Sequence, residues 1–116
     1  MGENKIYDTS AIVELAKKKA VQRVPYVSII TVVEYPPALE YAEVVLYPTR
    51  LEYLTAVKWQ SELRARGIPL PATDLIIAAQ AVNRNLVLVT RDKHFKILKE
   101  TVARDLELEL ESYQHS

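Results

Sequence analysis

The 116-residue sequence contains no cysteine, and it has only two glycines and two histidines. The absence of cysteine excludes disulfide bonds, zinc sites built on thiolates and thiol nucleophiles. The two histidines, His94 and His115, are too few for a zinc enzyme that relies on histidine ligands. Any metal site must therefore be formed mainly by oxygen ligands, which favours Mg²⁺ or Mn²⁺.

Long apolar runs and an excess of one charge are missing as well. No stretch approaches the ~20 apolar residues that cross a bilayer, and the first ten residues lack the basic and apolar regions of a signal peptide. We therefore expect a cytoplasmic protein without a membrane segment. Fifteen basic and fifteen acidic side chains cancel, which argues against tight nucleic-acid binding through overall charge. An enzyme that meets a phosphodiester through a metal ion and a few local cations is compatible with this balance.

Size and composition indicate one globular α/β domain. A chain of this length can form a hydrophobic core without disulfides or a structural metal. Its 49% of hydrophobic and 26% of charged residues are typical of soluble globular proteins. Because the sequence has no internal repeat, linker or low-complexity tract, we predict that residues 1–116 form a single domain.

The pattern of apolar residues predicts strands and helices in alternation. We expect strands at 5–7, 26–28, 44–47 and 86–89, and an edge strand in the alternating segment 106–112, LELELES. Helices are expected at 11–19, with Thr9 or Ser10 as the cap, at 50–66, 75–82 and 93–99, and from Thr31, which would place Glu34 in a first turn. Pro36 and Pro37 must kink or restart that helix. The alternation predicts a mainly parallel central sheet flanked by helices.

Acidic side chains occur where such a sheet binds ligands, beyond the carboxyl ends of its strands. Asp8 and Asp92 directly follow strand candidates, and Asp74 lies at a helix start, where the helix dipole favours a carboxylate. Taken singly, each acid has an ordinary explanation as a cap, a turn residue or a solvated helix residue. Their joint placement favours one shared site.

Four segments in this order resemble the PIN domain, and most closely the VapC-type toxins of toxin–antitoxin pairs: YDTSAIVEL, SIITVVEY, TDLIIAAQA and LVLVTRDKHF. The resemblance extends from Ile6 to about Leu98 and implies an endoribonuclease that acts on single-stranded RNA. Its Ser/Thr position near the last acid falls on Thr90, and we expect Ser10 and Thr90 to orient carboxylates by hydrogen bonding. The acidic positions of the family, which are catalytic and bind the metal, fall on Asp8, Glu34, Asp74 and Asp92.

A crevice with four ionised carboxylates requires a cation. Two unit charges ~4 Å apart repel by ~4 kcal/mol at an effective dielectric constant of 20, so the site needs Mg²⁺ or Mn²⁺, or else proton uptake. A bound ion would lower the pKa of a water molecule and orient the scissile phosphate. The resemblance implies products with a 5′-phosphate and a 3′-hydroxyl, a small antitoxin that covers the crevice, and a homodimer.

Two other functions remain compatible with the sequence. A catalytically silent PIN-like module that binds RNA or protein is favoured if the two prolines turn Glu34 away from the site. A phosphate-accepting, receiver-like signalling domain also uses acids at strand ends, but Asp8 has no adjacent acidic partner. Within the nuclease reading, a toxin and an RNA-processing enzyme both fit these residues, as do a site with one metal ion and a site with two.

A histidine and three cationic residues lie close to Asp92 in the sequence. A single histidine on a short surface helix is usually solvated, so we place His94 outside the site. Arg91, Lys93 and Lys96 could contact RNA phosphates, but similar charges coat many helices and serve solubility. We therefore predict that these three residues are solvated.

Overall fold

The computed structural model of the protein describes residues 4–19 and 22–111, so Ser112 of the predicted edge strand and His115 lie outside the described residues. The strands are β1 (Lys5–Tyr7), β2 (Val24–Ser28), β3 (Ala42–Leu46), β4 (Val87–Thr90) and β5 (Glu107–Leu110). The helices are α1 (Thr9–Lys17), α2 (Ile29–Glu34), the 3₁₀ helix η2 (Pro36–Glu40), α3 (Arg50–Ala65), α4 (Ala72–Asn83) and α5 (His94–Thr101).

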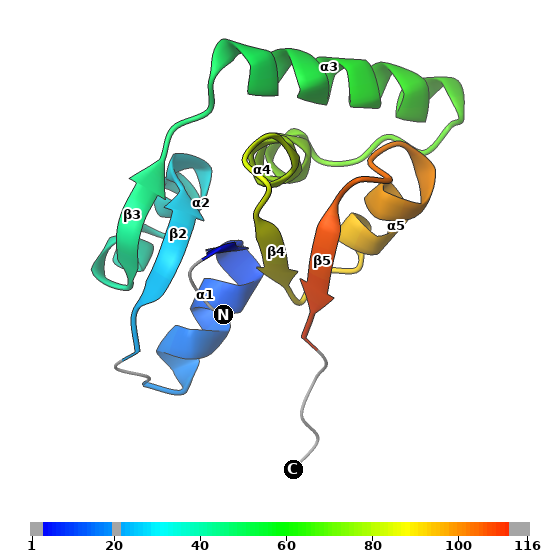
Figure 1. Ribbon diagram of the computed structural model, residues 1–116. Helices are drawn as coiled ribbons and strands as arrows, with labels where there is room; N and C mark the ends of the chain where they lie inside the picture. The colour runs from blue at the N-terminus through cyan, green and yellow to red at the C-terminus, as the bar shows by residue number, and fades with distance from the viewer. Residues whose placement is uncertain (1–3, 20–21, 112–116) are drawn as a thin grey trace.

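The five strands form one sheet in the order β3-β2-β1-β4-β5, and every neighbouring pair is parallel. The predicted parallel α/β fold is confirmed, and β5 lies at an edge as predicted. The chain proceeds from β1 to β2 and β3 on one side and then crosses to β4 and β5 on the other (Figure 1). The carboxyl ends of β1 and β4 therefore lie side by side at a topological switch point, where ligands bind in such sheets.

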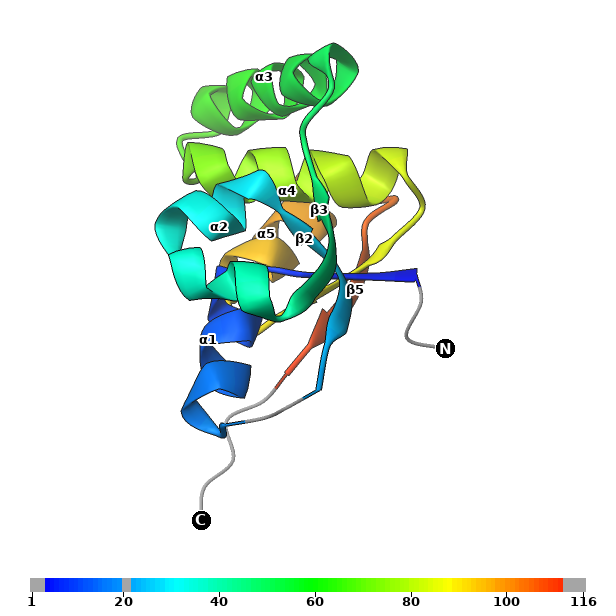
Figure 2. The same ribbon diagram turned by 90° about the vertical axis from the view of Figure 1, so that its left-hand side faces the viewer.

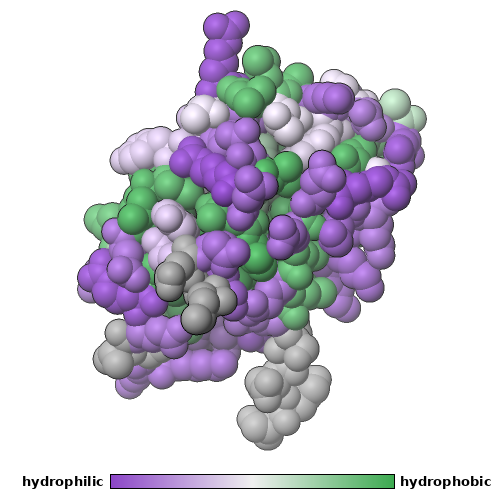
Figure 3. Space-filling view, in the orientation of Figure 1, coloured by the Kyte–Doolittle hydropathy of each residue, from purple (hydrophilic) through white to green (hydrophobic). Residues whose placement is uncertain are grey.

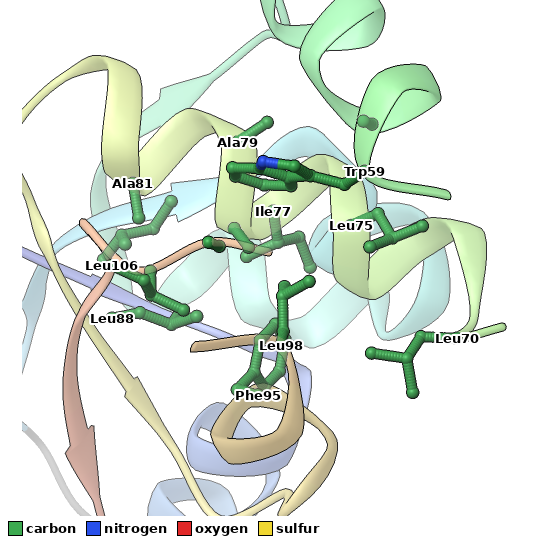
Figure 4. Packing of buried hydrophobic residues seen from close by; sticks show 14 of the residues in the cluster. Trp59, Leu70, Leu75, Ile77, Ala79, Ala81, Leu88, Phe95, Leu98 and Leu106 are labelled. Atoms are coloured by element: carbon green, nitrogen blue, oxygen red, sulfur yellow. The ribbon is translucent and has the colours of Figure 1, made fainter. Parts of the chain in front are cut away.

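Two hydrophobic clusters cover the sheet. Ile6 of β1 belongs to the larger cluster with α3, α4 and α5, and the adjacent Tyr7 packs against the smaller cluster, which includes Ile12 of α1. Successive side chains of a strand point to opposite faces, so helices protect both faces of the sheet, as a parallel sheet requires. Figure 4 shows Trp59 of α3 packed between that helix and α4, with Phe95 and Leu98 of α5 on the far side of the cluster.

An ion pair with a buried carboxylate joins α3 to the residue that follows α4. Glu52, in the first turn of α3, is fully buried, and its carboxylate accepts hydrogen bonds from Arg84 Nε at 2.9 Å and Arg84 Nη2 at 3.0 Å. Asn83 and the backbone N–H of Thr49 also donate to Glu52. Burial opposes ionisation, but these donors outweigh it and hold the pKa of Glu52 below its ordinary value. The ion pair anchors α4, which carries Asp74.

Several predicted details differ from the structure. Ser28, rather than Thr31, caps α2 because its hydroxyl reaches the backbone N–H of Ile30, and Glu34 consequently stands at the last residue of α2 instead of in a first turn. The two prolines do not kink α2; they start η2 after a break at Tyr35. Gly67 follows α3 with a φ of 77°, the left-handed conformation expected of a C-terminal glycine.

The surface carries apolar side chains among the charged ones (Figure 3). On α3, Leu51, Leu54 and Val57 are each more than half exposed. No helix among residues 4–19 and 22–111 is long and apolar enough to cross a membrane.

Candidate metal centre

An open cleft of ≈330 Å³ lies at the switch point. Its lining includes one acid from the end of β1, one from the end of α2, one from the first turn of α4 and one from the turn after β4. Figure 2 shows α1, α2, α4 and α5 gathered at this edge of the sheet. The lining residues are Asp8, Thr9, Ser10, Glu34, Asp74, Ile77 and Asp92. The fold thus brings together the four acids that the sequence singled out, although they are up to 84 positions apart.

Asp8 is the most firmly held of the four. It caps α1 in place of the predicted Thr9 or Ser10, because its Oδ1 lies 3.0 Å from the backbone N–H of Ala11. Oδ1 also accepts from Ser10 Oγ at 2.8 Å, and Oδ2 accepts from Thr90 Oγ1 at 2.6 Å. Burial raises the pKa of Asp8, and the three donors oppose that rise. Three of about four lone-pair sites of the carboxylate are used, and the residue lines the cleft.

The hydroxyls of Ser10 and Thr90 join Asp8 to the turn that carries Asp92. Thr90 Oγ1 accepts from the backbone N–H of Asp92 at 2.9 Å, and Ser10 Oγ accepts from the backbone N–H of Arg91 at 2.9 Å. Each hydroxyl therefore donates to Asp8 and accepts from the β4–α5 turn. These are the contacts that an orienting role for Ser10 and Thr90 requires.

Asp74 and Asp92 both line the cleft with ligand atoms within 4.8 Å of each other, and the pKa of Asp74 differs from that of an ordinary surface acid. Burial, and after it the negative charge of Asp92, raises the pKa of Asp74 to about 6. The Asp74 side chain is only 17% exposed. A carboxylate whose ionisation is opposed in this way gains much from a cation placed beside it.

His94 joins these two acids, contrary to our placement of it outside the site. Its Nδ1 lies 3.2 Å from Asp74 Oδ2 and 3.3 Å from Asp92 Oδ1. Ligand atoms of Asp74, Asp92 and His94 all fall within 4.8 Å of one another. One feature of the sequence could have indicated this contact: His94 follows Asp92 by two positions, in a segment predicted to turn. The approach of Asp74, twenty positions earlier, depends on how α4 packs.

Glu34 reaches the cleft despite the two prolines after it. Its Oε1 accepts from Thr9 Oγ1 at 2.6 Å, so the start of α1 holds the carboxylate at the end of α2. Because η2 begins only after Tyr35, the prolines leave the last turn of α2 intact. Glu34 is therefore not turned away, and the feature that would favour a catalytically silent module is not observed.

A second hollow, of ≈580 Å³, adjoins the acidic cleft and shares Ser10 and Asp92 with it. Lys17, Arg91 and Lys93 contribute its positive charges. The Arg91 side chain is 9% exposed and lies 3.5 Å from Glu14. The prediction of three solvated cations is therefore wrong for Arg91, and Lys96 is not part of this lining. The complete lining is Ser10, Val13, Glu14, Lys17, Arg91, Asp92, Lys93 and His94.

The donor set of the cleft fits a divalent cation. Two carboxylates and an imidazole converge at Asp74, Asp92 and His94, and the carboxylates of Asp8 and Glu34 line the same space. Oxygen-rich sets of this kind suit Mg²⁺ and Mn²⁺, whereas structural zinc prefers sulfur and nitrogen. Asp8, Glu34, Asp74 and Asp92 are the residues that would hold such an ion, and they lie at the position in the fold where ligands are expected.

Comparison with known proteins identifies the fold family. The sequence model of the PIN domain matches residues 5–100. This chain belongs to the PIN domain family. Among curated proteins, no significant match to this chain is found.

Solved structures share the fold at low sequence identity. VapBC-1 from nontypeable Haemophilus influenzae is 24% identical with a TM-score of 0.70, and the match covers 91% of this chain and 96% of that chain. VapBC2 from Rickettsia felis, bound to a DNA fragment from their promoter, is 19% identical with a TM-score of 0.71 and coverages of 95% and 98%. VapBC-5 from Mycobacterium tuberculosis, a member of the VapBC family of toxin–antitoxin systems, is 20% identical with a TM-score of 0.68 and coverages of 93% and 99%. The PIN fold is therefore shared over nearly the whole chain.

Proposed function

We propose that this protein is a divalent-metal-dependent endoribonuclease that cleaves single-stranded RNA by attack of water on the phosphodiester. The observation that carries the proposal is the convergence of Asp8, Glu34, Asp74 and Asp92 on one cleft at the switch point of a PIN fold. The raised pKa of Asp74 supports it, because the charge of Asp92 that opposes ionisation of Asp74 also attracts a metal ion. We propose Mg²⁺ or Mn²⁺ as the cofactor.

Each residue has a proposed role that follows from its contacts. Asp74 and Asp92 would hold the ion, and Asp8, fixed by three donors, would do so directly or through water. When bound, the ion supplies an activated water molecule and offsets charge that develops on the phosphate. Glu34, whose Oε1 is engaged by Thr9, has a second carboxylate oxygen with which it can orient that water and accept its proton.

The hollow beside the cleft supports a nucleic-acid substrate. A chain whose scissile phosphate lies at the acids would extend into the adjoining space, where the exposed Lys17 and Lys93 can meet neighbouring phosphates. The net charge of the protein is zero, so this local group of cations is the feature that offsets the repulsion between the acids and the RNA. Lys93→Gln should weaken RNA binding and raise KM with little change in kcat, whereas Lys58→Gln on the exposed side of α3 should do neither.

We further propose that the protein is the toxin of a toxin–antitoxin pair and acts in the cytoplasm, that a small antitoxin protein covers the cleft, and that the toxin forms a homodimer. The three solved structures compared above are VapBC structures, and one of them is described as a member of a family of toxin–antitoxin systems. Exposed Leu51, Leu54 and Val57 on α3 support a protein partner, because apolar side chains gathered on one helix face commonly mark an interface. Light scattering of the chain alone tests the homodimer. Light scattering of the chain mixed with the product of a neighbouring gene tests the complex with an antitoxin.

The nuclease proposal is tested by cleavage of a long single-stranded RNA in the presence of Mg²⁺ or Mn²⁺. Asp8→Asn should abolish cutting without unfolding the protein, because asparagine caps helices as well as aspartate does and keeps one oxygen for Ala11. Asp105→Asn, an exposed acid after α5, is the matched control and should cut normally. Cutting by Asp8→Asn at the wild-type rate, or by wild type in excess EDTA, contradicts the proposal.

A further inference from the structure

His94 makes two contacts with acidic side chains that a residue at the start of a surface helix does not need for helix formation. It is the first residue of α5, and its backbone N–H donates to Asp92 Oδ1 at 2.9 Å. This contact closes a tight turn that brings the imidazole back over Asp92. The same ring then reaches Asp74, which belongs to α4. The imidazole thus bridges two acids from different elements of the fold.

The two distances from the ring are nearly equal, at 3.2 Å to Asp74 Oδ2 and 3.3 Å to Asp92 Oδ1. One imidazole nitrogen carries either one hydrogen or one lone pair, so it can form only one well-directed hydrogen bond. Adjacent ligands of an octahedral ion with bonds of ~2.1 Å lie ~3 Å apart. The two distances from Nδ1 are close to the separation of adjacent ligands, and the ligand atoms of Asp74 and Asp92 lie within 4.8 Å of each other, so the three side chains are placed to share one cation.

The nature of the third donor affects which ion is preferred. Mg²⁺ is a hard cation that takes oxygen ligands and retains its waters, whereas Mn²⁺ binds nitrogen more readily. A site formed by carboxylates alone would discriminate weakly between the two ions. A nitrogen among the ligands shifts the balance toward Mn²⁺.

We propose that His94 is a direct metal ligand and that its nitrogen makes the site prefer Mn²⁺ over Mg²⁺. This inference rests on the proposed function, because it concerns the metal site of the same cleft. His94 adds to the four acids a ligand of a different kind, contributed by the turn that carries Asp92. Its ring is 46% exposed, so substitution at this position removes little buried surface.

The test compares metal affinities in the absence of RNA. Dissociation constants for Mn²⁺ and Mg²⁺ are measured by calorimetry and by competition against the Mn²⁺ paramagnetic signal, on protein without a histidine tag. His94→Asn replaces the ring nitrogen by a neutral amide oxygen at a similar reach, so the metal-bound site keeps the charge that it has with a neutral imidazole ligand. His115→Gln removes the only other histidine of the sequence and is the control.

We expect the preference for Mn²⁺ over Mg²⁺ to fall by at least ~10-fold in His94→Asn, the lower end of the effect produced by changes around metal ligands, and to be unchanged in His115→Gln. Pulsed paramagnetic resonance of the Mn²⁺-loaded wild type should detect a coordinated imidazole nitrogen, and this measurement needs no substitution. An unchanged preference together with no nitrogen coupling overturns the inference and leaves the nuclease proposal standing. A wild type that binds neither ion overturns both.

Discussion

Replacing Asp74 by asparagine should stabilise the metal-free protein at neutral pH. The pKa of Asp74 is about 6 in the folded protein against an ordinary value of 3.8, a difference of about two units at 1.36 kcal/mol each. Ionising the buried carboxyl at neutral pH therefore costs up to about 3 kcal/mol. Asparagine avoids this cost but loses part of the contact with His94, so we expect a net gain of about 1–2 kcal/mol in the free energy of unfolding.

The sign of the pH dependence follows from the same shift. Below pH 3.8 the carboxyl is protonated in both the folded and the unfolded protein, so the penalty is absent. It grows as the pH rises from 3.8 to about 6, and it is complete above that value. The advantage of Asp74→Asn over wild type should therefore be full at neutral pH and vanish under acidic conditions.

The assay is urea unfolding in EDTA at neutral pH and at about pH 4, for wild type, Asp74→Asn and the exposed control Asp105→Asn. With Mn²⁺ added, wild type should gain stability and Asp74→Asn should gain much less, because ligand binding stabilises only a protein with an intact site. An asparagine variant that is no more stable than wild type in EDTA at neutral pH refutes the electrostatic reasoning. An advantage that is the same at both pH values refutes it too.

Three further substitutions test other parts of the structure. Arg84→Ala leaves Glu52 buried without its charged partner and should lower the free energy of unfolding by about 3–5 kcal/mol in urea titrations; a loss near zero would show that the ion pair does not anchor α4. Gly67→Ala meets no neighbouring atom but places a side chain at a φ of 77°, so it should cost about 1 kcal/mol in the same titrations. Thr90→Val removes the 2.6 Å hydrogen bond to Asp8 and the acceptor for Asp92, so calorimetry should find Mn²⁺ binding weakened about 10–100-fold, and unchanged affinity would exclude an orienting role.

The strand and helix order and the place of the cleft could be predicted because they depend on local patterns. The aliphatic run at β4 and the alternation with helices indicate a parallel sheet, and in a parallel sheet Asp8 and Asp92 must share an edge. Strand boundaries were less predictable. β2 begins at Val24, two residues earlier than expected, even though Pro25 cannot donate a backbone hydrogen bond within the sheet.

The details that sequence reasoning missed depend on the reach of single side chains. Asp8, Thr9 and Ser10 are all good helix caps by type, and only the geometry after β1 selects Asp8. Ser28 displaces Thr31 in the same way at α2. The contact of His94 with Asp74 depends on the packing of α4 against α5, which no local pattern encodes.

The most direct test of the account is the chemistry of the cut ends. A short single-stranded RNA would be cleaved by the wild type under single-turnover conditions with Mn²⁺ in water enriched in ¹⁸O, and both product ends would be analysed by mass spectrometry. Attack by a water molecule at the acidic cleft predicts a 3′-hydroxyl on one product and a 5′-phosphate bearing one ¹⁸O atom on the other. A 2′,3′-cyclic phosphate without solvent label would show that the RNA's own 2′-hydroxyl is the nucleophile and would contradict the proposed role of the four acids.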